Sequence, residues 1–166
     1  RSFIVDDSVP ISKVTKPPQT GFIQNLSPIG GTSDSSLAQN DTYYLRVWYE
    51  AGADNYFWSG LGWVLNTQYQ LPVKVEGTTG TVGWGYPCNP VTPADCLPPG
   101  EHVSPTMGAL PDGTVFKVAI QARDLANNTE TPTTVQMILD RVGPTVTIST
   151  PAASASIIPA VIIPWP

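Results

Sequence analysis

The chain has few charged residues and a single histidine, and these shortages argue against several classes of protein. Charged residues make up 13% of its 166 residues, about half the usual share, and only eight are lysine or arginine. A nucleic-acid-binding groove needs clustered cations to neutralise phosphates. Because the basic residues are scattered and the net charge is −5, we expect no nucleic-acid partner.

Long apolar runs and helical periodicity are also scarce. The apolar tail at residues 157–165 is interrupted by Pro159 and Pro164, and it is far shorter than a membrane span. No basic segment followed by an apolar core marks a signal peptide. The 18 prolines and 14 glycines leave little room for helices and favour short strands joined by turns.

Cysteine is limited to Cys88 and Cys96, which bracket a proline-rich segment. Two cysteines with one histidine are poorly suited to zinc. We expect a local disulfide formed in an oxidising, extracellular compartment, and the alternative is a pair of free thiols.

Alternating apolar side chains identify the clearest strands. Residues 113–140 contain two such runs around a polar turn at residues 124–128. One face of the first run carries Phe116, Val118, Ile120 and Ala122, and the return run carries Val135, Met137 and Leu139. A period of two is typical of a half-buried strand, so this stretch predicts a long β-hairpin.

Similar patterns occur along the rest of the chain. We expect strands at residues 2–5, 11–15, 22–29, 43–50, 69–75 and 81–86, a tight hairpin at 55–63, a turn at 30–34 and a proline-rich insertion at 87–111. About seven short strands separated by turns predict an all-β fold, an immunoglobulin-like two-sheet sandwich.

The sequence also contains an internal repeat. Residues 3–10 match residues 137–144, and Asp6 and Asp140, like Pro10 and Pro144, are 134 positions apart. A fixed period is typical of tandem modules. We therefore expect residues 1–9 to end a preceding module, residues 10–143 to form one module, and residues 144–166 to begin another or to form an exchanged proline-rich tail.

Several segments resemble the tandem bacterial immunoglobulin-like repeats of large secreted or cell-surface proteins: "LSPIGGTSD", "YFWSGLGW", "FKVAIQARDLANN" and "MILDRVGPTVTISTP". The resemblance covers nearly the whole chain and implies a non-enzymatic, structural or adhesive module of a surface protein or filament. The sequence departs from the family pattern in three places. We assign Asn128 to the position of the usual glycine, and the cysteine-bearing insertion is extra. The tail has Ile163-Pro164-Trp165 where the module has Ile29-Gly30-Gly31.

Calcium is the cofactor that the acidic residues suggest. Asp6, Asp7 and Asp140 lie at the expected module junctions, and Asp124 lies on the hairpin turn. Converging carboxylates are the ligands that Ca²⁺ prefers. The alternative is that each aspartate caps a turn through nearby backbone N–H groups.

Aromatic residues suggest a second function, a carbohydrate-binding accessory module. Trp48, Tyr56, Trp58 and Trp63 could form a platform for surface glycans. The alternative is that this hairpin folds over the sandwich as part of the core.

Catalysis has little support in the sequence. His102 has Glu101 and Ser104 nearby, but a nucleophile, a base and an orienting group must converge in space, which neighbours on one loop do not ensure. We expect a surface histidine and no enzymatic activity.

Two further kinds of site depend on context. Asn25, Asn40 and Asn127 begin N-x-Ser/Thr motifs for glycosylation, whereas Asn128 does not. The duplicated strand predicts pairing with other copies or neighbouring modules by strand addition. The residues expected to exchange are Phe3, Ile4, Val5, Val146 and Ile148.

Overall fold

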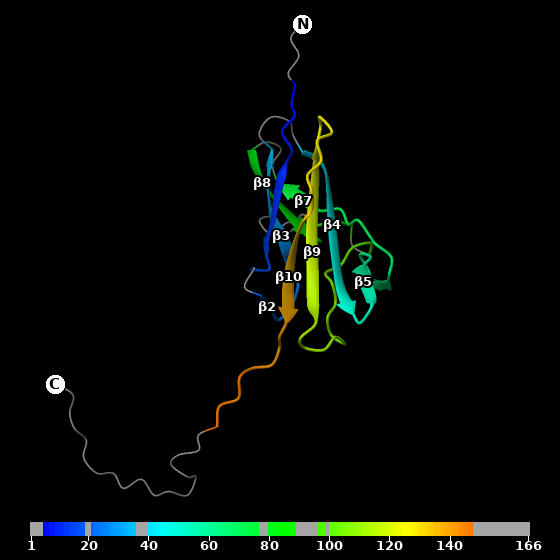
Figure 1. Ribbon diagram of the computed structural model, residues 1–166, viewed down its shortest axis with the longest axis vertical. Helices are drawn as coiled ribbons and strands as arrows, with labels where there is room; N and C mark the ends of the chain where they lie inside the picture. The colour runs from blue at the N-terminus through cyan, green and yellow to red at the C-terminus, as the bar shows by residue number, and fades with distance from the viewer. Residues whose placement is uncertain are drawn as a thin grey trace, which may run out of the picture.

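Two β-sheets pack face to face in the computed structural model, which describes residues 5–18, 21–35, 40–76, 80–88, 96–98 and 100–147 (Figure 1). These residues form strands and no helix, so the predicted all-β fold is confirmed. The strands are β1 (Ile11–Lys16), β2 (Phe22–Ile23), β3 (Ile29–Ser35), β4 (Asn40–Ala51), β5 (Asp54–Trp58), β6 (Trp63–Leu65), β7 (Lys74–Glu76), β8 (Gly80–Tyr86), β9 (Val115–Asp124) and β10 (Thr133–Leu139).

The order of strands within each sheet is that of an immunoglobulin-like sandwich. One sheet has the order β1-β3-β8-β7 and the other has the order β2-β10-β9-β4-β5-β6. The letters A to G can be given, in chain order, to β1, β3, β4, β7, β8, β9 and β10. The first sheet is then ABED, and the second contains GFC. Strands β5 and β6 extend the second sheet in the positions of C′ and C″, as in variable-type domains.

The chain crosses from the first sheet to the second at Pro17 and Pro18, between β1 and β2. Proline has no N–H to donate to a ladder, so the pairing of β1 with β3 ends there. Strand β2 then runs parallel to β10 on the opposite sheet. One short segment thereby connects the edges of both layers.

The core lies between the sheets and is lined mainly by β4 and β9. Both strands show the predicted alternation, because the expected inward residues have exposed fractions of 8% or less: Tyr43, Leu45, Val47 and Tyr49 from β4, and Phe116, Val118, Ile120 and Ala122 from β9. Trp84 and Tyr86 of β8 cover them from the other sheet and are fully buried. The period-two prediction for these strands is confirmed.

The prediction for residues 22–34 is wrong. Instead of one strand followed by a glycine-rich turn, the segment forms the short β2, a bend, and then β3, which includes both glycines. Strand β3 lies between β1 and β8. A Cβ at Gly31 would collide with the Lys13 carbonyl and the Trp84 ring, so glycine serves close packing here and does not form a turn.

The expected strand at residues 69–75 is also mostly wrong. Only Lys74–Glu76 forms a strand, and Leu71 makes an isolated bridge to Leu45 through two backbone hydrogen bonds of 2.8 and 2.9 Å.

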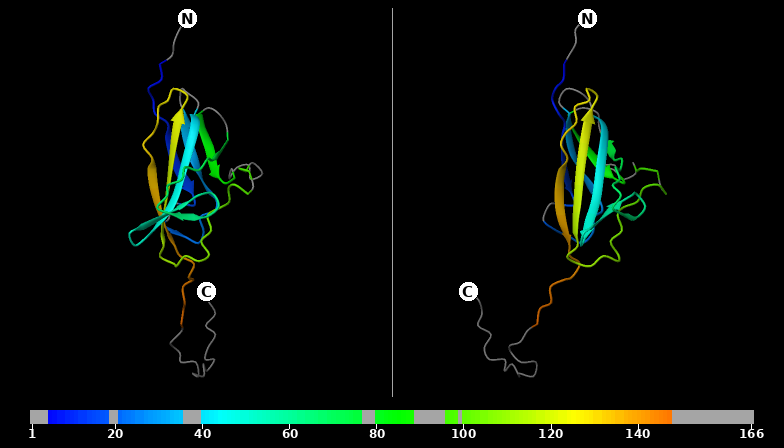
Figure 2. Two further views of the ribbon diagram at one scale, coloured as in Figure 1. Left: turned by 90° about the vertical axis from the view of Figure 1, so that its right-hand side faces the viewer. Right: turned by 45° about the vertical axis from the view of Figure 1, so that its right-hand side comes forward.

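The two ends of the described chain lie at opposite poles of the sandwich (Figures 1 and 2). The segment that starts at Val5 enters beside the turn between β9 and β10, which we call the N-terminal pole. The segment that follows β10 leaves at the other end, the C-terminal pole. We call residues 6–10 the entering linker and residues 140–144 the leaving linker.

Candidate functional site

The turn between β9 and β10 is organised by the carboxylate of Asp124. Only 2% of Asp124 is exposed. Its Oδ1 accepts a hydrogen bond from the Asn128 backbone N–H (2.8 Å), and its Oδ2 accepts one from the Asn128 Nδ2 (3.0 Å). The Asp124 and Asn127 backbone N–H groups close the same turn. Burial and charge-assisted hydrogen bonds therefore fix the Asn128 side chain.

The entering linker is attached to this turn at one point, and the strand that follows the linker is attached just after the turn. The Nδ2 of Asn128 also donates to the backbone carbonyl of Asp6 (2.9 Å). Beyond the linker, the buried Glu130 accepts hydrogen bonds from the Ser12 backbone N–H (2.7 Å) and the Ala122 backbone N–H (2.6 Å). The carboxylate of Glu130 thus connects the start of β1 to β9.

The glycine-like residue of this turn is Asn127, which corrects our assignment of Asn128 to that position. Asn127 has a φ of 68°, in the left-handed region where glycine and asparagine are favoured. The two asparagines therefore have separate roles: Asn127 provides the backbone conformation and Asn128 provides the side-chain contacts.

At the C-terminal pole, Arg141 holds the leaving linker against its own module. Its Nε donates to the Asp112 Oδ1 (3.0 Å). Its Nη1 and Nη2 groups donate to the carbonyls of Met107 (3.3 Å) and Leu110 (2.6 Å). The planar guanidinium reaches three acceptors on one loop with three separate nitrogens, whereas a lysine would offer a single nitrogen.

The two linkers adopt the same local turn. Asp6 Oδ1 accepts a hydrogen bond from the Ser8 backbone N–H (3.0 Å), and Asp140 Oδ1 accepts one from the Val142 backbone N–H (3.2 Å). These pairs occupy equivalent positions of the 134-residue repeat. The sequence match is therefore accompanied by the same backbone–side-chain contact at both poles.

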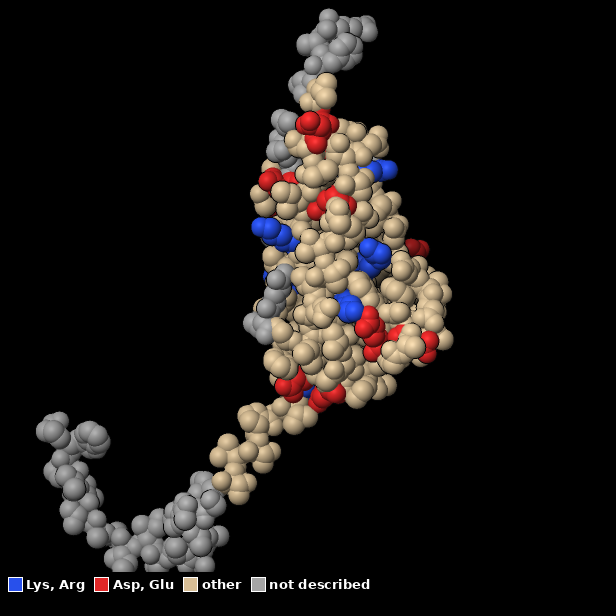
Figure 3. Space-filling model, viewed as in Figure 1, with Lys and Arg blue, Asp and Glu red and all other residues tan. Residues whose placement is uncertain are grey.

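The aspartates proposed for calcium are divided between the poles. Asp6 and Asp124 contact the same Asn128, Asp140 lies at the opposite end, and Asp7 is exposed. Figure 3 shows acidic side chains near both ends of a largely uncharged surface. Among the described residues, no group of three or more His, Cys, Asp or Glu side chains could hold a metal. The carboxylates of Asp6, Asp124 and Asp140 instead accept backbone N–H groups.

The aromatic residues proposed for sugar binding pack largely among themselves. Trp58 has no exposed surface, and its indole N–H donates to the Tyr86 hydroxyl (3.2 Å) and the Val103 carbonyl (3.1 Å). The indole of Trp63 donates to the Thr106 carbonyl (2.7 Å). The ring of Trp48 stacks on Phe57 at 6.0 Å. The carbonyls of Val103 and Thr106 thus bind two of the four proposed side chains.

A groove of about 500 Å³ lies beside Tyr56, near the C-terminal pole. Tyr49 and Tyr56 stack with ring centroids 5.0 Å apart, and burial, with a smaller contribution from Tyr56, raises the pKa of Tyr49. The two carboxylates of the groove are paired: Glu50 with Lys117, and Asp112 with Arg141. Both charged groups are thus already engaged within the protein.

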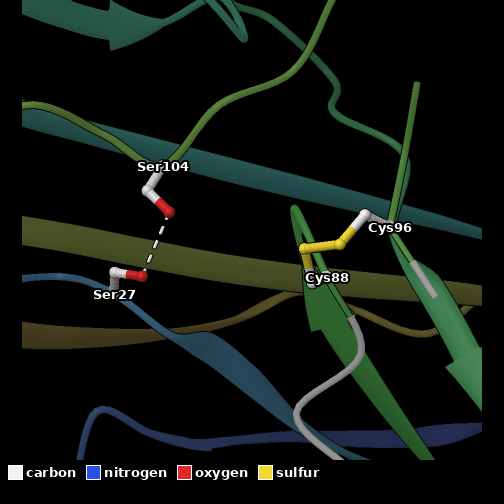
Figure 4. The surroundings of a disulfide bond; sticks show 4 residues. All are labelled: Ser27, Cys88, Cys96 and Ser104. Carbon is white, nitrogen blue, oxygen red and sulfur yellow. Dashed lines mark hydrogen bonds between the residues drawn. A yellow bond between two sulfur atoms is a disulfide. The ribbon is translucent and has the colours of Figure 1, made fainter. Parts of the chain in front are cut away.

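The predicted disulfide is present. Cys88 and Cys96 are joined with their Cα atoms 4.0 Å apart, and Figure 4 shows the bond beside a hydrogen bond between the hydroxyls of Ser27 and Ser104 (3.0 Å). The disulfide closes the start of the proline-rich insertion. The Ser104 hydroxyl is therefore engaged with another serine.

His102 lies against an aromatic residue. Its Nδ1 is 3.5 Å from the Tyr86 hydroxyl, and the two rings meet edge to face at 5.9 Å. Burial raises the pKa of Tyr86 to about 12, although the hydrogen bond from Trp58 opposes the shift. A tyrosine with this pKa is a neutral hydrogen-bonding partner at ordinary pH and a poor general base.

The remaining predicted sites are only partly within the described chain. Asn25 and Asn127 are exposed, and the Asn25 Oδ1 accepts a hydrogen bond from Ser27. Val5 and Val146 are 85% and 84% exposed. Outside the described residues lie Phe3, Ile4, Ile148 and the side chain of Asn40.

No family model matches the chain, and no curated protein matches it. In the described part, we find no helix of the length and apolarity that crossing a membrane requires.

Proposed function

We propose that this chain is an extracellular structural or adhesive module of a surface protein or filament, one of a series joined end to end. The observation that carries this proposal is the equivalence of the two linkers. They lie at opposite poles, occupy matching positions of the repeat and make the same aspartate turn. A unit built this way can be joined end to end with others of its kind.

The exposure of Val5 supports the same proposal. Val5 is 85% exposed, whereas its counterpart in the repeat, Leu139 at the end of β10, is fully buried. A large apolar residue is stabilised by about 1.5–3 kcal/mol when it is buried. A preceding module would bury Val5 at the end of its own last strand. The disulfide supports an oxidising, extracellular location.

The contacts of the aromatic residues favour this function over carbohydrate binding. Trp58 presents no face to a sugar, and both charged groups in the groove beside Tyr56 are already paired. A glycan array probed with the chain checks the alternative. Binding that Tyr56→Ala abolishes would favour the carbohydrate-binding module.

Imaging of the native parent protein tests the proposal. Antibodies against this module should label intact, unpermeabilised source cells. Negative-stain images of the extracted protein should show a row of globules at constant spacing. Label confined to the cell interior, or a particle with one globule of this kind, would overturn the proposal.

A further inference from the structure

At the N-terminal pole, the turn between β9 and β10 binds the backbone of the entering linker. The carboxylate of Asp124 fixes the Asn128 side chain, which then donates its remaining amide hydrogen to the Asp6 carbonyl. A side-chain amide has two N–H donors, and here one is used inside the turn and the other on the linker. We call residues 124–128 the linker socket.

The contacts of the socket do not depend on the side chains of the linker. Its bond is to a backbone carbonyl, and Asp7, Ser8 and Val9 of the entering linker are all exposed. The feature of the linker that determines its local shape is the turn formed by Asp6. Any linker that makes this turn offers an equivalent carbonyl.

The leaving linker makes the same turn through Asp140. Its remaining residues differ from those of the entering linker, but only at the exposed positions, where Arg141, Val142 and Gly143 replace Asp7, Ser8 and Val9. The leaving linker of one module therefore matches the socket of the next.

The leaving linker is also held firmly by its own module. The backbone N–H of Asp140 donates to the Ile23 carbonyl (2.9 Å), and Arg141 binds Asp112 and the carbonyls of Met107 and Leu110. If the socket of a second module binds the Asp140 carbonyl, residues 140 and 141 are held from both sides. No freely rotating residue then separates the two anchors.

We propose that residues 124–128 are the docking site for the leaving linker of a second copy of this repeat, and that the bond from Asn128 to the Asp140 carbonyl makes the joint between modules rigid. This inference rests on the proposed tandem arrangement and adds to it the contact that sets the angle between modules.

The intact chain allows a first test with the entering linker as probe. The Asp7 amide belongs to the same planar peptide as the Asp6 carbonyl. Its NMR order parameter should be near the rigid value of about 0.85, and Asn128→Ala should lower it below about 0.6. As a control, replacing the exposed Asn25 with alanine should leave it unchanged. A low order parameter in the unsubstituted chain, or no response to Asn128→Ala, would overturn the inference.

A fusion tests the joint itself. Residues 1–143 followed directly by residues 10–166 preserve the repeat, with Asp140 in place of Asp6 at the joint. Residual dipolar couplings should fit one alignment tensor for both modules. Asn128→Ala in the second module should separate the tensors. The same substitution in the first module is the matched control, because that socket faces no preceding module, and the single tensor should persist.

Independent tensors in the unsubstituted fusion, or the same response to Asn128→Ala in either module, would overturn the rigid joint. This failure is distinguishable from failure of the proposed function. If native particles are rows of globules but the fusion is flexible, the tandem arrangement is supported and the proposal of a rigid joint is wrong. If native particles have one globule, the proposed tandem arrangement is wrong, whatever the result with the fusion.

Discussion

The entering and leaving linkers have the same sequence pattern and the same aspartate turn, but the groups that anchor them differ. The entering linker is held by side chains from elsewhere, Asn128 on its Asp6 carbonyl and Glu130 on Ser12 just beyond it. The leaving linker holds itself in place, because its own Arg141 reaches the loop at residues 107–112. The local turn is thus common to both copies of the repeated segment, whereas the anchorage differs, because the leaving linker has Arg141 where the entering linker has Asp7.

Removal of Glu130 should have the largest effect on the entering side. Glu130→Ala leaves the buried N–H groups of Ser12 and Ala122 without acceptors, so the free energy of unfolding should fall by about 3 kcal/mol. Urea denaturation measures this change. Glu76→Ala, at the exposed end of β7, is the matched control and should change it by less than about 0.5 kcal/mol. A decrease in the free energy of unfolding below about 1 kcal/mol would show that water accepts these two hydrogen bonds in place of the carboxylate.

Loss of the disulfide should destabilise the sandwich without changing the structure of either linker. Replacing Cys88 and Cys96 with serine opens a short loop and should lower the free energy of unfolding by about 2–3 kcal/mol. The measurement is thermal unfolding with and without reductant. The unfolding temperature of the substituted chain should not change when reductant is added. The amide chemical shifts of Ser8 and Val142 should stay unchanged. A shift at either amide would mean that the insertion also orders a linker.

Substitution of Arg141 should affect only the leaving side. Arg141→Ala removes three hydrogen bonds, but the side chain is about a third exposed and its ion pair is screened by solvent. The expected loss of stability is therefore about 1 kcal/mol. Arg141→Lys should recover little of it, because an ammonium cannot reproduce the planar arrangement of donors. NMR order parameters should fall at Val142 and remain unchanged at Ser8. Equal changes at both positions would contradict separate anchorage.

The smallest effects are the most direct test of the equivalence of the linkers. Asp6→Ala and Asp140→Ala each remove one exposed turn hydrogen bond, so each should cost about 0.5 kcal/mol. The Ser8 amide should shift in the first variant and the Val142 amide in the second. Costs that differ by more than about 1 kcal/mol would show that one aspartate has an additional role, such as metal binding.

Sequence reasoning located the central strands because their signal is local. In β4 and β9 the alternation of apolar residues matches the burial, since successive side chains point to opposite sheet faces. The sequence-based prediction failed at Gly30 and Gly31 because glycine is common both in turns and where strands pack closely. Only the positions of Lys13 and Trp84 distinguish the two cases.

The candidate site was anticipated only in part. Residues 124–128 were predicted to form the polar turn of the hairpin, and they form it beside Asp6. Their interactions with one another were not predicted, because an aspartate near asparagines is compatible both with metal binding and with a capped turn. Glu130 and Arg141 were missed altogether. Their partners, Ser12 and Met107, are far away in the sequence, and no local pattern signals a contact of that kind.

Local sequence patterns were enough to predict the all-β class, the positions of the strands with strict alternation, the disulfide and the repeated aspartate turn. Each of these depends on residues that are neighbours or nearly so. No such pattern predicts that the repeated segments lie at opposite poles, that Asn128 binds the Asp6 carbonyl or that Trp58 is buried. These outcomes depend on contacts between residues distant in sequence, which arise only when the two sheets pack together.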